Sequence, residues 1–146
     1  MRSLRQSAHG HGGTRRECLR RRLSARVLVI EDEPIVAMSI AGIVSRMGHS
    51  VCGVAQSRSE AFERARDGRP TLILADVRLR GGDDGIRTVE EIVGRTPMPV
   101  IFITGHAQDL IQQLRMRPTL VIGKPFMPQT LEVAVRRVLS RQALTA

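Results

Sequence analysis

The feature that most constrains the fold is an alternation that begins at Arg26 and runs through the rest of the chain. Five short apolar runs, rich in β-branched residues, alternate with five stretches in which apolar residues recur at helical spacing. Runs of this kind are typical of strands that are buried on both faces. The predicted strands cover residues 27–30, 50–55, 71–75, 100–103 and 119–122. Their alternation with amphipathic helices predicts an α/β fold with a parallel sheet.

The intervening stretches carry helix start and stop signals. Pro34 and Pro128 are suited to the first position of a helix, and Gly48 to the position just after one. Gly68 and Pro70 end the second stretch. The predicted inward faces are Val36, Ile40, Ile43, Val44 and Met47; Ala61, Phe62 and Ala65; Ile86, Val89, Ile92 and Val93; Leu110, Ile111 and Leu114; and Leu131, Val135, Val138 and Leu139. The whole pattern predicts a doubly wound (βα)5 sheet of the flavodoxin-like order 2-1-3-4-5.

Polar side chains follow four of the predicted strands. Glu31 and Asp32 come after the first strand, Asp76 after the third, Thr104 after the fourth and Lys124 after the fifth. In doubly wound sheets ligands bind outside the carboxyl ends of the strands. Strands one, three, four and five are neighbours in the predicted order, so we expect these side chains to converge.

Carboxylates gathered at one sheet edge need a counter-charge. Two of them about 4 Å apart repel by roughly 4 kcal/mol at an effective dielectric constant near 20. An all-oxygen donor set without Cys or His favours Mg²⁺ over zinc. Lys124 is the only lysine among 23 basic residues, and a compact ammonium fits a narrow phosphoryl pocket better than a planar guanidinium does. The combination predicts a site for a phosphoryl group.

On these positions, residues from about 26 to 142 resemble a response-regulator receiver domain, the phosphoacceptor part of two-component signalling. The resemblance implies that Asp76 attacks a phosphohistidine presented by a sensor histidine kinase or a phosphotransfer protein. Thr104 and Lys124 would receive the phosphoryl oxygens. Such a domain is not an enzyme in the usual sense, because it catalyses only its own phosphorylation and dephosphorylation.

The same resemblance implies a metal site. Mg²⁺ would be held by Asp32, Asp76 and the backbone carbonyl of Arg78, with Glu31 acting largely through water. In members of the family the peptide bond before the proline that follows the lysine, here Pro125, is cis.

A narrower resemblance concerns two segments. Residues 75–79 and 100–104, with nine residues from Asp76 to Gly85, resemble the receiver half of alphaproteobacterial general stress-response regulators. Those proteins carry a sigma-factor-like domain ahead of the receiver, whereas about 25 residues precede it here. We therefore expect a stand-alone receiver, and a role in stress response stays open.

The predicted output is a protein–protein contact. Phosphorylation is expected to move Thr104 and to change the face formed by helix four, strand five and helix five, where a downstream protein or a second copy would bind. The usual aromatic switch position holds Val121, and the fourth residue past Asp76 is Arg80 instead of the frequent proline. We expect Arg78 and His106 to alter the dephosphorylation rate, with a sign that the sequence leaves open.

Residues 1–24 differ from the rest in charge. They contain seven arginines and one glutamate, and we expect them to form a disordered basic arm ahead of a receiver domain over residues 25–146. One alternative is that this arm binds nucleic-acid phosphates. The absence of Tyr and Trp from the chain, and of Phe from the arm, argues against base stacking there.

Two other interpretations of the function stay open. The domain could be a binding module that works without phosphorylation, or a small phosphatase with Asp76 as nucleophile. A phosphatase of this kind would need a second acid two residues after Asp76, where this chain has Arg78.

No apolar stretch approaches the roughly 18–20 residues of a membrane span, and Cys18 and Cys52 form no disulfide or metal pattern. We expect a cytoplasmic protein without a membrane partner.

Overall fold

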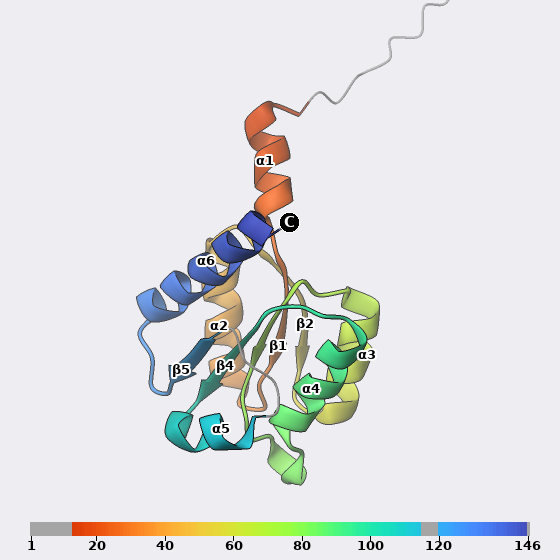
Figure 1. Ribbon diagram of the computed structural model, residues 1–146, viewed down its shortest axis with the longest axis vertical. Helices are drawn as coiled ribbons and strands as arrows, with labels where there is room; N and C mark the ends of the chain where they lie inside the picture. The colour runs from red at the N-terminus through yellow and green to blue at the C-terminus, as the bar shows by residue number, and fades with distance from the viewer. Residues whose placement is uncertain (1–12, 115–119, 146) are drawn as a thin grey trace, which may run out of the picture.

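A computed structural model describes residues 13–114 and 120–145 (Figure 1). At its centre is a five-stranded sheet of order β2-β1-β3-β4-β5, in which every neighbouring pair is parallel. The predicted fold class and strand order are confirmed. The strands are β1 (Arg26–Ile30), β2 (Ser50–Ala55), β3 (Leu72–Ala75), β4 (Val100–Thr104) and β5 (Leu120–Gly123). Thr119, placed at the start of the fifth predicted strand, lies outside the described residues.

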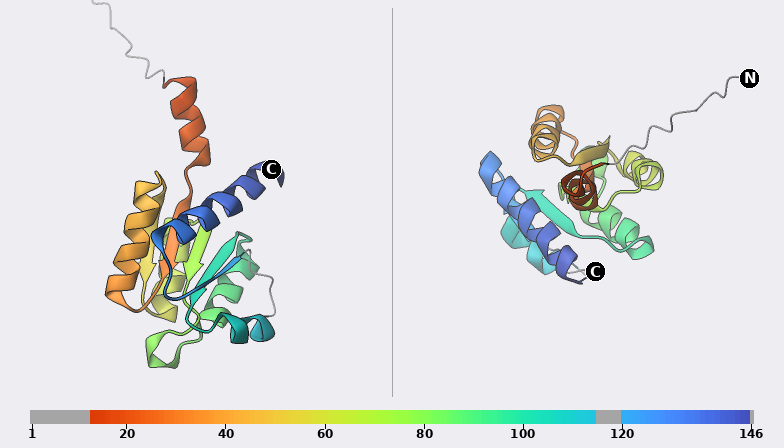
Figure 2. Two further views of the ribbon diagram at one scale, coloured as in Figure 1. Left: turned by 90° about the vertical axis from the view of Figure 1, so that its left-hand side faces the viewer. Right: turned by 90° about the horizontal axis from the view of Figure 1, so that it is seen from above.

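Helices cover both faces of the sheet, and the described ones are α1 (Arg15–Leu23), α2 (Pro34–Arg46), α3 (Arg58–Gly68), α4 (Gly85–Arg95), α5 (Ala107–Gln113) and α6 (Pro128–Thr145), with a 3₁₀ turn η1 (Arg80–Gly82). Figure 2 shows α2 and α6 on one side and α3 and α4 on the other. Because α1 precedes the alternating unit, helices four and five of the prediction are α5 and α6. None of these helices is long and apolar enough to cross a membrane.

The central strands have no solvent-facing side. Along β1, Val27 and Val29 pack with α2 and α6, whereas Leu28 and Ile30 pack with the helices of the other face. All four side chains are fully buried. Burial of a side chain of this size stabilises the fold by roughly 1.5–3 kcal/mol. This two-sided burial explains why the sequence shows continuous apolar runs instead of alternating ones.

The loop predicted around Gly81 and Gly82 contains η1 and ends at the start of α4. Asp84 is the residue before that helix, and its carboxylate accepts hydrogen bonds from the backbone N–H groups of Ile86 (2.9 Å) and Arg87 (3.3 Å). The cap satisfies two N–H groups that the helix itself cannot pair. The segment after β3 is therefore held in place by the helix that follows it.

The expectation of a disordered arm is wrong for Arg15–Leu23, which form helix α1. The backbone N–H of Glu17 donates to the Thr14 hydroxyl (3.3 Å), and the Thr14 N–H donates to the Glu17 carboxylate (2.9 Å). This reciprocal pair is a capping box, which stabilises a helix start. Figure 1 shows α1 projecting from the end of the molecule where β1 begins. Residues 1–12 lie outside the described residues, and the boundary at residue 25 stays a prediction.

Stability should depend on the protonation of His49. Its Nδ1 accepts a hydrogen bond from the backbone N–H of Ala25 (3.2 Å), and burial lowers its pKa. The folded state therefore favours the neutral imidazole, whose stabilising contribution is present above the ordinary pKa of 6.5 and is lost as pH falls through the lower folded value.

We expect the free energy of unfolding, measured by urea denaturation, to fall from about pH 7.5 to about pH 5. The substitution His49→Asn keeps an acceptor oxygen without a titrating ring and should flatten part of this slope. An equal slope in the two proteins would contradict the assignment.

Candidate functional site

The site lies at the carboxyl edge of the sheet, where backbone hydrogen bonds continue past the strands. The N–H of Asp76 donates to the carbonyl of Ile30 (2.8 Å), and the N–H of Lys124 donates to the carbonyl of Thr104 (2.8 Å). These bonds bind β3 to β1 and β5 to β4 at the point where the polar residues begin. The side chains of the site are thus carried on rigid backbone.

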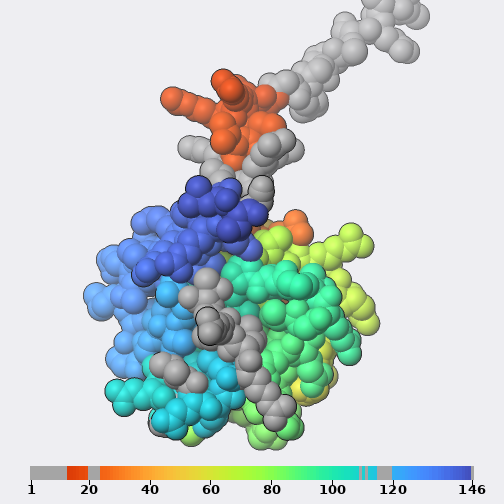
Figure 3. Space-filling view, viewed as in Figure 1, coloured from red at the N-terminus to blue at the C-terminus, as the bar shows by residue number. Residues whose placement is uncertain are grey.

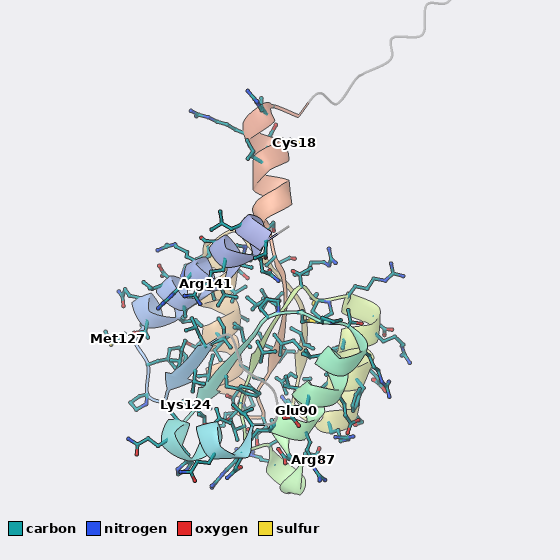
Figure 4. The ribbon with its side chains drawn as sticks, in the orientation of Figure 1. Cys18, Arg87, Glu90, Lys124, Met127 and Arg141 are labelled. Carbon is teal, nitrogen blue, oxygen red and sulfur yellow. The ribbon has the colours of Figure 1, made fainter. Side chains whose placement is uncertain are left out.

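Lys124 joins two carboxylates from different strands. Its Nζ lies 2.7 Å from Oε2 of Glu31 and 2.9 Å from Oδ2 of Asp76. The exposed fractions of the three side chains are 18% for Lys124, 1% for Glu31 and 11% for Asp76. Figure 4 shows the ammonium side chain at the end of the sheet beside α5. The expected convergence of these residues is confirmed, and the direct contact with Glu31 was not predicted.

Burial and hydrogen bonds shift the pKa values of Glu31 and Lys124. Burial raises the pKa of Glu31, and the hydrogen bond from Lys124 offsets this only in part, while the nearby Asp76 carboxylate raises it further. Burial also lowers the pKa of Lys124, but its hydrogen bonds to Glu31 and Asp76 outweigh burial and leave that pKa raised. The lysine is therefore held firmly in its charged form.

Asp32 is engaged by the turn that follows Asp76. Its Oδ2 accepts a hydrogen bond from the backbone N–H of Arg80 (2.7 Å), and the Arg80 Nε lies 3.6 Å from the same oxygen. The Arg80 side chain is 76% exposed, so the ion pair contributes little. The backbone bond attaches η1 to the acidic cluster. Sequence reasoning noted Arg80 only as a departure from the family pattern and missed this contact.

A cavity of about 440 Å³ opens between these groups. It is lined by Asp32, Glu33, Asp76, Arg78, Leu79, Arg80, Thr104, Gly105, His106 and Lys124. Thr104 is buried, and its hydroxyl accepts a hydrogen bond from the backbone N–H of His106 (3.1 Å). The structure therefore brings together Asp32, Asp76, Thr104 and Lys124 around one hollow, with Glu31 reached through the lysine.

The acidic cluster fits a hard cation. One carboxylate oxygen from each of Glu31, Asp32 and Asp76 lies within 4.8 Å of the others. Three carboxylates and the ammonium of Lys124 leave two negative charges, which a divalent cation with oxygen preference would neutralise. The backbone N–H of Arg78 lies 3.4 Å from Oδ1 of Asp76, and the part of its carbonyl as a ligand stays a prediction. The peptide bond between Lys124 and Pro125 is cis, as the resemblance implied.

The site thus combines a parallel α/β sheet with a strand-end aspartate, an ammonium, a buried hydroxyl and an acidic pair. The sequence profile of the response regulator receiver domain matches residues 27–136, and the chain belongs to this family. Phosphorylation of an aspartate and binding of Mg²⁺ are generic to its members.

The most similar relatives include PhyR proteins. The phyllosphere-induced regulator PhyR of Methylorubrum extorquens is 37% identical over 118 residues, which are 80% of this chain and 44% of that protein. The solution structure of the receiver domain of Erythrobacter litoralis PhyR has a TM-score of 0.75 at 38% identity, covering 80% of this chain and 91% of that one. A crystal structure described as the anti-anti-sigma factor PhyR from Bartonella quintana has a TM-score of 0.76 at 36% identity, covering 84% of this chain and 50% of that one. The chain thus spans about half the length of full-length PhyR proteins.

Gly85 lies tightly against the backbone of Asp76 and Val77. A Cβ at this residue would meet the backbone carbonyl oxygens of Asp76 and Val77, whereas nothing lies within 4 Å of a Cβ at Gly94 in the same helix. We expect Gly85→Ala to destabilise the protein by about 2 kcal/mol or more, because backbone atoms must shift. The control Gly94→Ala should be neutral or gain about 0.5–1 kcal/mol. Urea denaturation measures both, and equal effects would contradict the close approach.

Proposed function

We propose that this receiver domain accepts a phosphoryl group on Asp76 in a Mg²⁺-dependent reaction and signals through protein–protein contacts. The observation that supports this most directly is the ammonium of Lys124, held between Glu31 and Asp76 inside a cluster of three carboxylates. A structural ion pair would need one carboxylate. The surplus of buried negative charge, which costs free energy, calls for a cation.

The proposed reaction begins when a carboxylate oxygen of Asp76 attacks the phosphorus of a phosphohistidine. The new P–O bond forms as the P–N bond breaks, and the electron pair leaves with the imidazole of the donor. The Asp76 carboxylate becomes an acyl phosphate, so Lys124 exchanges a carboxylate oxygen for a phosphoryl oxygen, and the Thr104 hydroxyl donates to another. Each interaction strengthens as charge moves onto the phosphoryl oxygens.

Glu31, Asp32, Asp76 and the backbone carbonyl of Arg78 are the residues that would hold the cation. When bound, Mg²⁺ would neutralise the carboxylates and stabilise negative charge on the transferred group. Dephosphorylation would use the same groups, with water in place of the histidine. The protein would thus act on its own aspartate and have no separate substrate to turn over.

The surroundings of the cavity support a protein as phosphodonor. Ile35 and Met38, on the first turns of α2, are 83% and 75% exposed, and Met127, just past β5, is 66% exposed. Figure 4 shows Met127 at the outer surface between β5 and α6. Exposed apolar side chains beside a functional site are typical of contact surfaces. We propose that a histidine kinase or a phosphotransfer protein docks here. We also propose that the protein works in the cytoplasm, together with this donor.

For the output, we propose that phosphorylation draws the Thr104 hydroxyl toward the site and alters the face of α5, β5 and α6. Val121 occupies the position in β5 where an aromatic side chain would move with the threonine, so the change would pass through the β4–α5 loop itself. The description of the Bartonella quintana relative as an anti-anti-sigma factor supports a regulatory protein as target. Self-association through this face is a further part of the proposal.

Incubation with acetyl phosphate should add one phosphoryl group to the wild-type protein in the presence of Mg²⁺, as measured by intact mass. The substitution Asp76→Asn should abolish the gain, and the control Asp67→Asn, at an exposed residue of α3, should leave it unchanged. If no gain occurs, a beryllofluoride titration follows, because some receivers reject small donors. Failure in both assays would favour a binding module that works without phosphorylation.

The substitution Lys124→Arg should separate the binding of Mg²⁺ from the phosphorylation of Asp76. A guanidinium keeps the charge but is too wide for the position between Glu31 and Asp76. We expect Mg²⁺ binding, measured by calorimetry, to persist while the phosphorylation rate falls roughly 10²-fold. An unchanged rate would mean that a compact ammonium is not required.

A further inference from the structure

A second, larger hollow lies away from the phosphoacceptor site. It has a volume of about 1,340 Å³, follows the seam between α3 and α4, and continues to the end of α6. Residues 96–98, which precede β4, and Thr145 of α6 line its far end. Figure 3 shows the end of α6 at the end of the molecule that carries α1. We call this hollow the arginine groove.

The groove carries an excess of positive charge. Two glutamates, Glu63 and Glu91, line it together with five arginines, which gives a formal sum of +3. The arginines are Arg26, Arg58, Arg66, Arg69 and Arg95. Arg58 pairs with Glu91 (2.6 Å) and Arg66 with Asp67 (3.0 Å). The other three arginines take no part in these two ion pairs, and Arg95 lies near enough to Glu91 to help lower the pKa of that carboxylate.

The groove also has an apolar floor. Phe62 of α3 is half-buried there, and the guanidinium carbons of Arg58 and Arg95 lie 5.0 Å and 5.6 Å from the centre of its ring. Ala65, Ile92, Pro97 and Met98 complete the apolar lining. The groove therefore combines apolar side chains with guanidinium groups, two of which already lie over the ring of Phe62.

Arg69 is held at the rim by a strained backbone. It ends α3 with φ 44° and ψ 62°, in the left-handed region that glycine usually occupies. Its carbonyl accepts a hydrogen bond from Nε of Arg26 (2.8 Å), which fixes the two arginine-bearing segments together. A long cationic side chain at this position is unfavourable for the isolated fold, which is consistent with a use in binding.

The size and lining of the groove indicate its ligand. Its volume exceeds the roughly 300–1,000 Å³ of most small-molecule sites. A nucleic-acid backbone would meet the carboxylates of Glu63 and Glu91 and would leave the apolar floor without a partner, and Arg58 and Arg95 obstruct base stacking on Phe62. An acidic amphipathic segment instead supplies carboxylates for the rim and apolar side chains for the floor.

We propose that the arginine groove is a docking site for an acidic amphipathic segment of a partner protein, separate from the phosphoacceptor site. Helix α1 adds to the charge complementarity, because it projects from the same end of the molecule and carries exposed Arg15 and Arg16 (Figure 1). A positive surface around the groove would increase the association rate of an acidic partner. Arg69 and Arg95 are the residues on which binding should depend most.

The test uses the full chain and a fluorescein-labelled peptide of about 15 residues, with leucine at helical spacing and glutamate on the other face. Binding is followed by fluorescence anisotropy at low and physiological salt. Three comparison probes replace glutamate with lysine, replace leucine with serine, or substitute a single-stranded oligonucleotide. The double variant Arg69→Gly with Arg95→Ala removes both rim charges, and the glycine is compatible with the left-handed backbone. The control pair Arg46→Ala with Arg137→Ala removes the same charge from exposed sites on α2 and α6.

We expect the acidic amphipathic peptide to bind best, and the groove variant to raise its dissociation constant by about tenfold or more. The control pair should change it by less than about twofold. Asp76→Asn should leave it unchanged, so a failure of the phosphorylation assay would not affect this result. Equal losses in the two double variants, no saturation up to about 1 mM peptide, or tighter binding of the oligonucleotide to the groove would each overturn the proposal.

Discussion

The ion pairs of Lys124 with Glu31 and Asp76 are the interactions on which the site depends. They join residues 93 and 48 positions apart in the chain, and they exist only because β5, β1 and β3 end at the same edge of the sheet. Without the ammonium, three carboxylates within 4.8 Å of one another would have only the exposed guanidinium of Arg80 nearby, an unfavourable arrangement. The lysine thus makes the acidic cluster compatible with folding. It neutralises one of the three negative charges and leaves two that a divalent cation could neutralise.

The segment between β3 and α4 connects this site to the helical layer. The backbone N–H of Arg80 binds Asp32, while the Asp83 carboxylate accepts the backbone N–H of Arg58 at the start of α3 (2.9 Å). Arg58 in turn pairs with Glu91 of α4. A continuous set of contacts therefore runs from the acidic cluster to the α3–α4 seam where the arginine groove begins. These contacts connect the two sites through the packed structure.

The phosphoacceptor cavity and the arginine groove differ in their balance of charge. Three carboxylates and three cations line the cavity, whereas five arginines and two glutamates line the groove. Two sites with different balances of charge on one small domain can bind different partners.

The sequence by itself determined the sheet, its order and the convergence of Asp76, Thr104 and Lys124. Apolar periodicity is a local signal, and the topology of doubly wound sheets brings strand ends together. The sequence also contains the capping box of α1, formed by Thr14 and Glu17, although the high arginine content of this segment had favoured a prediction of disorder. Only the tertiary structure decided that Glu31 binds the lysine, that Arg80 reaches Asp32, and that five dispersed arginines line one groove. These contacts depend on side-chain directions and loop paths between distant segments, which no periodicity within a single segment specifies.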